Sequence, residues 1–173
     1  QIQGFFDMPV DNLFTTPLFS KFIKKKITSK KLICVSPDMG GVARTRALAT
    51  RIKADLAIID KRRPAPGESE VMNIIGDVKN KTCIIVDDII DSGGTIINAV
   101  DALKKKGAKE VYVFITHAVL SGDAAKKIKN SKINKLIITD SIDNSNKIKN
   151  NNKIEVLSIT SLMSEAIKRI ANS

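Results

Sequence analysis

The residues best suited to chemistry lie in one short stretch, residues 86–95, with the sequence VDDIIDSGGT. An apolar run precedes it and a helical pattern follows it, so Asp87 and Asp88 stand at the tip of a buried strand. Asp91, two hydroxyl residues and two glycines make the turn into the helix. Backbone N–H groups at a helix N-terminus bind phosphate, and glycines let the phosphate come close. Carboxylates suit sugar hydroxyls or a divalent cation, so the stretch predicts a sugar-phosphate site.

The alternative for residues 86–95 is a structural corner between a strand and a helix, with acids that cap the helix. Capping requires one acid, whereas this turn carries three, Asp87, Asp88 and Asp91. The number of acids therefore favours the sugar-phosphate interpretation over the structural one.

A second turn of the same kind follows an apolar run at residues 36–41, with the sequence SPDMGG. Here too a strand, an acid and paired glycines lead into a predicted helix. Arg44 and Arg46 lie in the first turns of that helix, where positive charge is unfavourable for the helix dipole. We expect an anion to bind there; the alternative is a pair of arginines that face solvent.

Residues 61–70, KRRPAPGESE, combine three consecutive cations with a loop broken by proline and glycine. Such a run is usually solvated surface. Because it follows a predicted strand at the same edge as the two turns, we expect it to be a lid over bound phosphates.

Alternating strands and helices predict an α/β fold with three layers, a mostly parallel sheet flanked by helices. We expect strands at residues 31–35, 55–60, 82–88, 111–116, 136–139 and 154–159. We expect helices at residues 17–26, 42–53, 95–106 and 161–170, and a further helix that residues 121–123 cap and that ends near residue 130. Residues 71–78 should be extended, and 142–153 a surface excursion. Ligands of such sheets bind beyond the C-terminal ends of the strands, where the acidic turns, the basic loop and His117 all fall. For His117 we favour a structural, hydrogen-bonded role over general-base catalysis.

Composition excludes several classes of function. The formal charge is +11, but lysines are scattered and aromatic residues make up only 4% of the chain, so we expect no nucleic-acid partner. Apolar runs are too short to span a membrane. Cys34 and Cys83 fall within predicted buried strands without metal-binding spacing, which suits the cytoplasm. Five of the six phenylalanines lie within the first 22 residues, so this segment should pack against its own sheet or a partner.

Residues 86–95 resemble the phosphoribosyl pyrophosphate motif of type I phosphoribosyltransferases. Three further stretches resemble ribose-phosphate pyrophosphokinases: residues 35–44 their pyrophosphate loop, 59–64 their catalytic flexible loop, and 1–12 the end of their signature segment. The resemblance covers essentially the whole chain. It implies a phosphoribosyltransferase-like fold and transfer of the pyrophosphoryl group of ATP to the 1-hydroxyl of ribose 5-phosphate, giving phosphoribosyl pyrophosphate and AMP. It also implies Mg²⁺ and a homo-oligomer of dimers that assemble to a hexamer.

The resemblance also implies roles for individual residues. The ribose 5-phosphate subsite comprises two acids for the sugar hydroxyls and four turn residues for the phosphate: Asp87, Asp91, Ser92, Gly93, Gly94 and Thr95. The pyrophosphate loop comprises Asp38, Met39, Gly40 and Gly41. Asp38 is the implied metal ligand, and Lys61 and Arg63 are the implied catalytic residues.

The family's chains are about twice as long, so this one resembles the C-terminal domain of a two-domain synthetase and we expect it to be inactive alone. Two alternatives stay open. A phosphoribosyltransferase shares residues 86–95 but needs a base-recognition element. A non-catalytic regulator associated with the synthetase would bind sugar phosphate without turnover, but such proteins tend to lose acids and basic residues that are present here.

Overall fold

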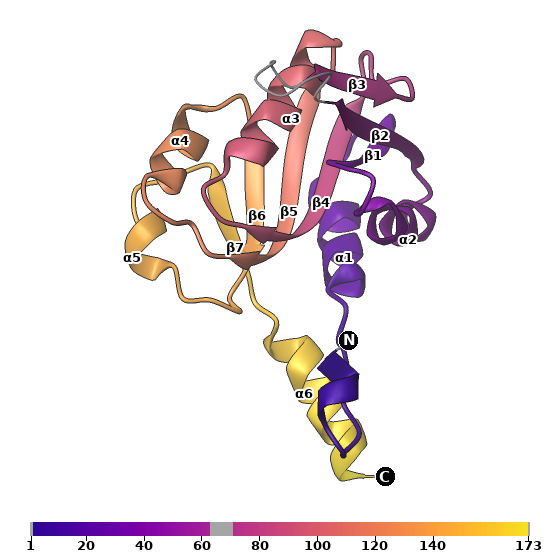
Figure 1. Cartoon of the computed structure of the whole chain (residues 1–173), viewed down its shortest axis with the longest axis vertical. Helices are drawn as coiled ribbons and strands as arrows, with labels where there is room; N and C mark the ends of the chain where they lie inside the picture. Colours follow the sequence, from indigo (N-terminus) through magenta and orange to yellow (C-terminus); the bar gives the residue numbers. More distant parts are fainter. Residues whose placement is uncertain (1, 63–70, 173) are drawn as a thin grey trace.

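A seven-stranded sheet runs through the computed structural model, which describes residues 2–62 and 71–172 of the chain (Figure 1). Its strand order is β3-β2-β1-β4-β5-β6-β7. The strands are β1 (Leu32–Ser36), β2 (Asp55–Arg62), β3 (Val71–Ile75), β4 (Thr82–Ile90), β5 (Glu110–Ala118), β6 (Lys135–Thr139) and β7 (Ile154–Leu157). β3 pairs antiparallel with β2, whereas the other neighbouring pairs are parallel. The predicted α/β fold with a mostly parallel sheet is therefore confirmed.

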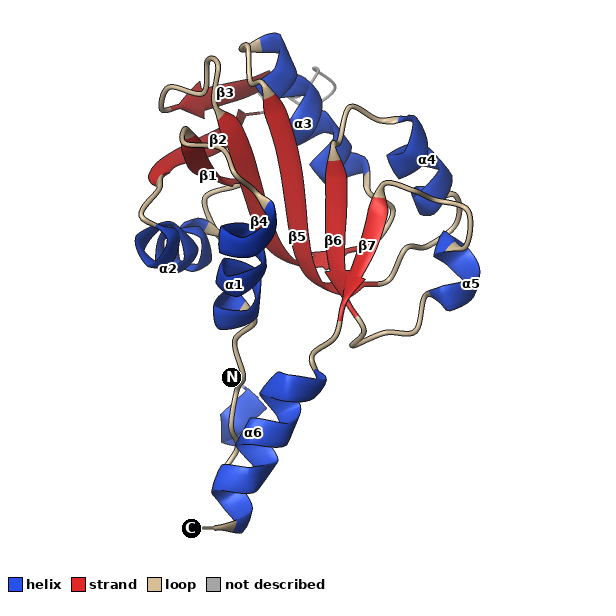
Figure 2. Cartoon of the chain, turned by 180° about the vertical axis from the view of Figure 1, so that it is seen from behind, coloured by secondary structure: helices blue, strands red, loops and turns tan. Residues whose placement is uncertain are grey.

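Helices cover both faces of the sheet, which gives the three predicted layers. On one face lie α1 (Thr16–Lys26) and α2 (Val42–Ile52), and on the other α3 (Gly94–Lys105) and α4 (Ala124–Asn130) (Figures 1 and 2). The remaining helices are the short 3₁₀ helix η1 (Ile2–Phe5), the short α5 (Ser145–Ile148) and the last helix, α6 (Thr160–Ala171). No described helix has the length and apolar character needed to traverse a lipid bilayer.

Alternation along the strands builds a separate core on each face, because successive side chains of a strand point to opposite sides. Cys83 and Ile85 of β4 join the core beneath α3 and α4, whereas Ile84 and Val86 join the core beneath α1 and α2. The central strands are thus buried on both faces, which explains why they read as continuous apolar runs. The polar residues that follow them are left at the sheet edge.

The two ends of the described chain leave the body of the molecule in the same direction (Figures 1 and 2). α6 follows β7 directly, and in the described structure none of its residues is buried. The N-terminal segment before α1 is also largely exposed, including Phe5 and Phe6. Neither segment belongs to the two cores that hold the sheet and its helices together.

Four local predictions need correction. β7 ends at Leu157 and not at residue 159, because α6 already begins at Thr160. Lys61 and Arg62 are the last residues of β2 and pair with β3, so the basic run begins inside a strand and not in a loop. β4 and β5 each extend two residues beyond prediction because Ile89 and Ile90 pair with β5. Residues 142–153 are more than a surface excursion, since Asn144 and Asn151 are buried and donate hydrogen bonds to backbone carbonyls.

Candidate functional site

The turn from β4 into α3 forms a cavity of about 250 Å³, and we call residues 91–95 the phosphate turn. Gly93 occupies the N-cap position of α3 with a φ of 80°, in the left-handed region that favours glycine. Among the described residues, no side chain caps this helix. The first amides of a helix have no partner within it, so those of α3 remain available to an anion in the cavity.

The predicted ribose residues meet around this cavity. Asp87 lines it from the strand, and the phosphate turn closes the other side. The lining residues are Asp87, Ile89, Ile90, Asp91, Ser92, Gly93, Gly94, Thr95 and Ile96. A carboxylate on one side and unpaired amides on the other suit a ligand with hydroxyls and a phosphate, as the sequence predicts.

Asp87 is a largely buried carboxylate at this edge. Its side chain is 17% exposed, and burial raises its pKa. A backbone hydrogen bond from Asp88 and the charge of Arg44 act in the opposite direction, while the charge of Asp88 adds to the rise. A desolvated acid beside a cavity is typical of a functional site.

The pyrophosphate loop, residues 38–41, is held by its own hydrogen bonds. Ser36 Oγ donates to the Asp38 carbonyl at 2.6 Å, and the Gly41 amide donates to Asp38 Oδ1 at 2.8 Å. A Cβ on Gly41 would lie 2.9 Å from Ser36 Oγ, so only glycine fits there without displacing this contact. Met39 and Gly40 are exposed at the tip. Since β1 pairs with β4, the loop lies at the same sheet edge as Asp87.

The predicted catalytic residues are only partly placed. Lys61 is half-buried near the end of β2, opposite Met72 of β3. Its strand lies beside β1, which brings Lys61 to the C-terminal edge of the sheet. Arg63 and the other residues of the predicted lid from 64 to 70 lie outside the described residues, whereas Lys61 and Arg62 belong to β2.

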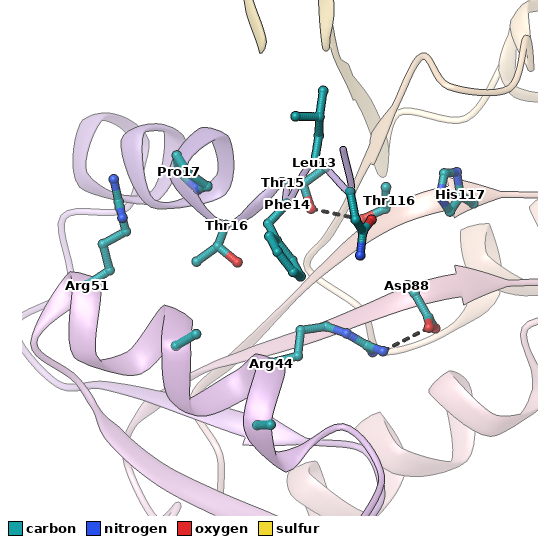
Figure 3. A pocket seen from close by; sticks show the side chains of 13 residues that line it. Leu13, Phe14, Thr15, Thr16, Pro17, Arg44, Arg51, Asp88, Thr116 and His117 are labelled. Atoms are coloured by element: carbon teal, nitrogen blue, oxygen red, sulfur yellow. Dashed lines mark hydrogen bonds and ion pairs between the residues drawn. The ribbon is translucent and has the colours of Figure 1, made fainter. Parts of the chain in front are cut away.

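A larger cavity of about 680 Å³ lies at the same edge of the sheet, and no sequence pattern predicts it (Figure 3). It is lined by residues 12–17 of the N-terminal segment, by Arg44 and Arg51 of α2, and by Asp88 and His117 of the strands. The hydroxyls of Thr15 and Thr116, 2.9 Å apart, join the N-terminal segment to β5. Residues 12–17 escaped prediction because they show no periodicity.

Arg44 links the two cavities. Its Nη1 donates to Asp87 Oδ1, and its Nη2 donates to Asp88 Oδ2 at 2.8 Å. The anion that the sequence predicts beside Arg44 is thus supplied by the protein's own acids. Arg46, the other arginine of this helix start, is exposed. The adjacent acids Asp87 and Asp88 could have predicted this ion pair, because two neighbouring carboxylates repel each other unless a cation lies beside them.

His117 has a hydrogen-bond partner, and both cysteines are buried thiols. His117 Nδ1 lies 3.0 Å from Ser141 Oγ, which agrees with the predicted hydrogen-bonded role. Burial raises the pKa of both Cys34 and Cys83 to about 12, and thiols of that kind are poor nucleophiles near neutral pH.

In the described part of the chain, no group of three or more His, Cys, Asp or Glu side chains is arranged to hold a metal ion. Magnesium in nucleotide sites is commonly bound by one or two carboxylates together with phosphate oxygens. Asp38 fits that mode, because its Oδ1 accepts a hydrogen bond from the Gly41 amide, while in the described structure no hydrogen bond reaches its Oδ2. Residues 2–62 and 71–172 thus form no metal site from protein groups alone, and a metal carried by a phosphate ligand is compatible with Asp38.

Comparison with known proteins agrees with this geometry. The chain is 59% identical over 171 residues to the ribose-phosphate pyrophosphokinase of Bradyrhizobium diazoefficiens, an alignment that covers 99% of this chain and 54% of that protein. The crystal structure of phosphoribosylpyrophosphate synthetase from Mycobacterium smegmatis is similar with a TM-score of 0.88 and 36% identity, over 99% of this chain and 55% of that one. The chain spans about half the length of the curated relatives it matches.

A purine phosphoribosyltransferase from Pyrococcus horikoshii matches less well, with a TM-score of 0.51 and 25% identity over 62% of this chain and 73% of that one. The resemblance to ribose-phosphate pyrophosphokinases is confirmed by these relatives. Residues 62–173 match the family described as the phosphoribosyl synthetase-associated domain. With more than half of its residues matched, the chain belongs to the phosphoribosyl synthetase-associated domain family.

Proposed function

We propose that this chain is the C-terminal domain of a ribose-phosphate pyrophosphokinase, where it binds ribose 5-phosphate and the pyrophosphoryl group of ATP. The observation that carries the proposal is the shared sheet edge: the phosphate turn follows β4, and the pyrophosphate loop follows the adjacent β1. Neighbouring strands lie about 4.8 Å apart. Acceptor and donor groups bound at these two turns would therefore be close enough to react.

In the acceptor subsite, Asp87 and Asp91 accept hydrogen bonds from the ribose hydroxyls. The amides of residues 92–95 and the hydroxyls of Ser92 and Thr95 donate hydrogen bonds to the oxygens of the 5-phosphate. The absence of a side-chain cap on α3 in the described structure supports this assignment, because a capped helix start would have to give up its cap to bind phosphate.

The reaction joins the 1-hydroxyl oxygen of ribose 5-phosphate to the β-phosphorus of ATP, and the bond from that phosphorus to the α,β-bridging oxygen breaks. AMP leaves, and the hydroxyl proton is lost to solvent. Pyrophosphoryl transfer depends on positioning and on neutralising negative charge more than on a covalent intermediate. The lack of an activated cysteine in the described site is consistent with this mechanism.

Within the donor subsite, the exposed tip of the pyrophosphate loop, Met39 and Gly40, lies against the pyrophosphoryl group. Asp38 would hold Mg²⁺ together with phosphate oxygens, and the ion would neutralise charge on those oxygens. Lys61 and Arg63 are the proposed catalytic cations. The place of Lys61 at the end of β2 supports its part in this assignment.

We place the remainder of the ATP site in a second domain, and we infer that this chain alone is inactive. The length of the relatives supports this, since the chain spans about half of each. The exposed apolar residues of the two projecting ends also support it, because large exposed apolar patches mark interaction sites. They are Phe5, Phe6, Met8, Leu13, Phe14, Met163, Ile167 and Ile170. We further propose a homo-oligomer, dimers that assemble to a hexamer, in the cytoplasm.

Two other functions share parts of this site. A phosphoribosyltransferase would use the phosphate turn to consume phosphoribosyl pyrophosphate, but the transferase from Pyrococcus horikoshii covers only 62% of this chain. A regulator without turnover would need neither Lys61 nor Asp38, and both are present at the sheet edge. Both observations favour the pyrophosphokinase.

The three functions are separated by supplying ribose 5-phosphate and MgATP to the intact gene product and measuring AMP by chromatography. A pyrophosphokinase releases AMP and phosphoribosyl pyrophosphate in equal amounts. A transferase releases no AMP but consumes phosphoribosyl pyrophosphate when a base is added. Binding of ribose 5-phosphate without AMP release would overturn the proposed catalysis in favour of the regulator.

A further inference from the structure

Arg44 is the one described residue that joins the start of α2, directly after the pyrophosphate loop, to the acids of β4. Its guanidinium forks between Asp87 Oδ1 and Asp88 Oδ2, and the side chain itself is only 33% exposed. Figure 3 shows the side chain extending from α2 toward Asp88 (Figure 3). A forked guanidinium fixes carboxylates in direction as well as in charge.

The hydrogen bonds around Asp87 leave one oxygen available. Oδ1 receives both the guanidinium of Arg44 and the backbone amide of Asp88, the latter at 3.0 Å. In the described structure no hydrogen bond reaches Oδ2. Because Asp87 lines the phosphate-turn cavity, fixing Oδ1 leaves Oδ2 as the atom that can accept a hydrogen bond from a ligand there.

Asp88 differs from Asp87 in two respects: both of its oxygens accept hydrogen bonds, and it lines the larger cavity. Its Oδ1 receives the amide of Ile89 at 2.9 Å, and its Oδ2 receives Arg44. Asp88 and Arg44 line the larger cavity, whereas Asp87 lines the smaller one. The ion-pair cluster of Arg44, Asp87 and Asp88 therefore forms part of the wall between the two cavities.

We propose that Arg44 is a positioning residue for sugar binding: its guanidinium fixes Oδ1 of Asp87, so that Oδ2 is presented to the phosphate-turn cavity, and Arg44 does not itself contact the sugar phosphate. The sugar phosphate named here rests on the proposed function. The geometric part, an arginine of α2 that sets the charge and direction of Asp87, stands on the ion pairs alone. Lysine cannot reproduce it fully, because an ammonium group lacks the planar fork.

Removing Arg44 also has a consequence that can be measured without any ligand. Its charge lowers the pKa of Asp87, while burial and the charge of Asp88 raise it. Without Arg44 the pKa of Asp87 must therefore rise further. The other charged or titratable groups at this edge include Asp91 after β4, Asp38 after β1, Lys61 of β2, His117 on β5 and Asp140 after β6, and none of them is altered by the substitution.

The experiment compares the chain with its Arg44→Ala, Arg44→Lys and Arg46→Ala variants. Arg46→Ala is the matched control, because it removes the same charge from an exposed position of the same helix. Carbon-13 NMR follows the Asp87 carboxyl carbon as a function of pH without ligand. Calorimetry follows ribose 5-phosphate binding near neutral pH.

We expect Arg44→Ala to move the Asp87 titration to higher pH and to weaken ribose 5-phosphate binding about tenfold, the scale of one hydrogen bond to a charged group. Arg44→Lys should keep the midpoint of the Asp87 titration close to that of the unaltered chain, but it should retain only part of the affinity for ribose 5-phosphate. Arg46→Ala should change neither quantity. Adding Asp88→Asn to Arg44→Ala should bring the titration back toward lower pH, because it removes the repulsive neighbour.

Weaker binding with an unchanged Asp87 titration would overturn the proposal, since it would make Arg44 a direct ligand contact. An unchanged titration and unchanged affinity would overturn it as well. If Arg44→Ala fails to fold, Arg44→Lys tests the proposal, because it should leave the Asp87 titration nearly unchanged and still weaken ribose 5-phosphate binding. Failure of the unaltered chain to bind ribose 5-phosphate would count against the proposed function, while the Asp87 titration would still decide the positioning role.

Discussion

Burial of the Asp87 carboxylate works against the stability of the folded chain. Asp87 is a mostly buried carboxylate whose pKa is raised by burial, despite the opposing effects of the Asp88 amide and Arg44. A carboxylic acid whose pKa rises on folding makes the folded state less stable wherever the acid is ionised. Binding sites commonly retain groups of this kind.

We therefore expect Asp87→Asn to increase the free energy of unfolding at about pH 7 and to weaken ribose 5-phosphate binding. Because the folded pKa lies above the unfolded value, the unaltered chain gains stability as the pH falls through the folded pKa. The advantage of the variant should shrink over that range and be gone below the unfolded pKa of about 3.9. Urea denaturation at several pH values measures the difference; an advantage that is independent of pH would contradict the explanation.

Gly93 of the phosphate turn cannot be substituted without backbone strain. Its φ of 80° is costly for any side chain, by about 1–2 kcal/mol. We expect Gly93→Ala to lower the free energy of unfolding by that amount and to displace the first amides of α3. Gly94→Ala is the control, since a Cβ there meets nothing closer than 4.0 Å. Equal stability of the two variants, measured by thermal unfolding, would show that the left-handed turn is unimportant.

At the scale of elements, the sequence predicts the turns at the ends of β1 and β4, but not the pairing of β2 with β3 or the buried asparagines after β6. Apolar runs followed by acids and glycines place Asp38 and Asp87 correctly, because buried parallel strands have a clear pattern. Lys61 was placed in a loop because its strand partner, β3, lies beyond a polar segment. Asn144 and Asn151 are buried by hydrogen bonds to carbonyls 26 residues away, a partnership that no local pattern reveals.

The larger cavity escaped prediction for a related reason. It forms where residues 12–17 meet α2 and the ends of β4 and β5, so it depends on the path of an irregular segment. The Arg44 cluster was foreseen in part: the sequence indicates that Arg44 needs an anion, but not that the anion is the Asp87 and Asp88 pair. Long-range pairing of charges is a property of the folded chain.

The end of β2 gives a prediction about catalysis. In the longer synthetase that we propose contains this chain, Lys61→Ala should lower the turnover number by about 100-fold, the scale of one lost charge-stabilising donor. The affinity for ribose 5-phosphate should be unchanged, because Lys61 does not line the phosphate-turn cavity. Lys31→Ala is the control, since Lys31 is exposed and precedes β1 at the opposite edge. Steady-state kinetics would contradict the role of Lys61 if the Michaelis constant changed and the turnover did not.

At the scale of the whole molecule, the chain has a complete sheet and core but carries exposed apolar ends. Phe5, Ile167 and Ile170 are 84%, 61% and 60% exposed. These side chains contribute little to the stability of the chain alone. If the ends pack against the second domain of a longer protein, the same side chains become buried there and acquire an energetic role.

We expect Phe5→Ser combined with Ile167→Ser to change the stability of this chain by less than about 0.5 kcal/mol. The same pair should destabilise the longer protein by a clearly larger amount, because burial of each side chain would be lost. Phe19→Ala, in the core beneath α1, should cost about 3 kcal/mol in both. Thermal unfolding of the two lengths compares them, and equal small effects in both would exclude packing of these ends between domains.

The most direct measurement is an NMR titration of this 173-residue chain with ribose 5-phosphate, followed through the backbone amides. We predict saturable shifts centred on residues 91–95 and on Asp87, with ribose and inorganic phosphate each binding more weakly than the sugar phosphate. No AMP should form when MgATP is added to the chain alone. Shifts that avoid the phosphate turn, or equal binding of ribose and ribose 5-phosphate, would contradict the assignment of this edge as the ribose 5-phosphate subsite.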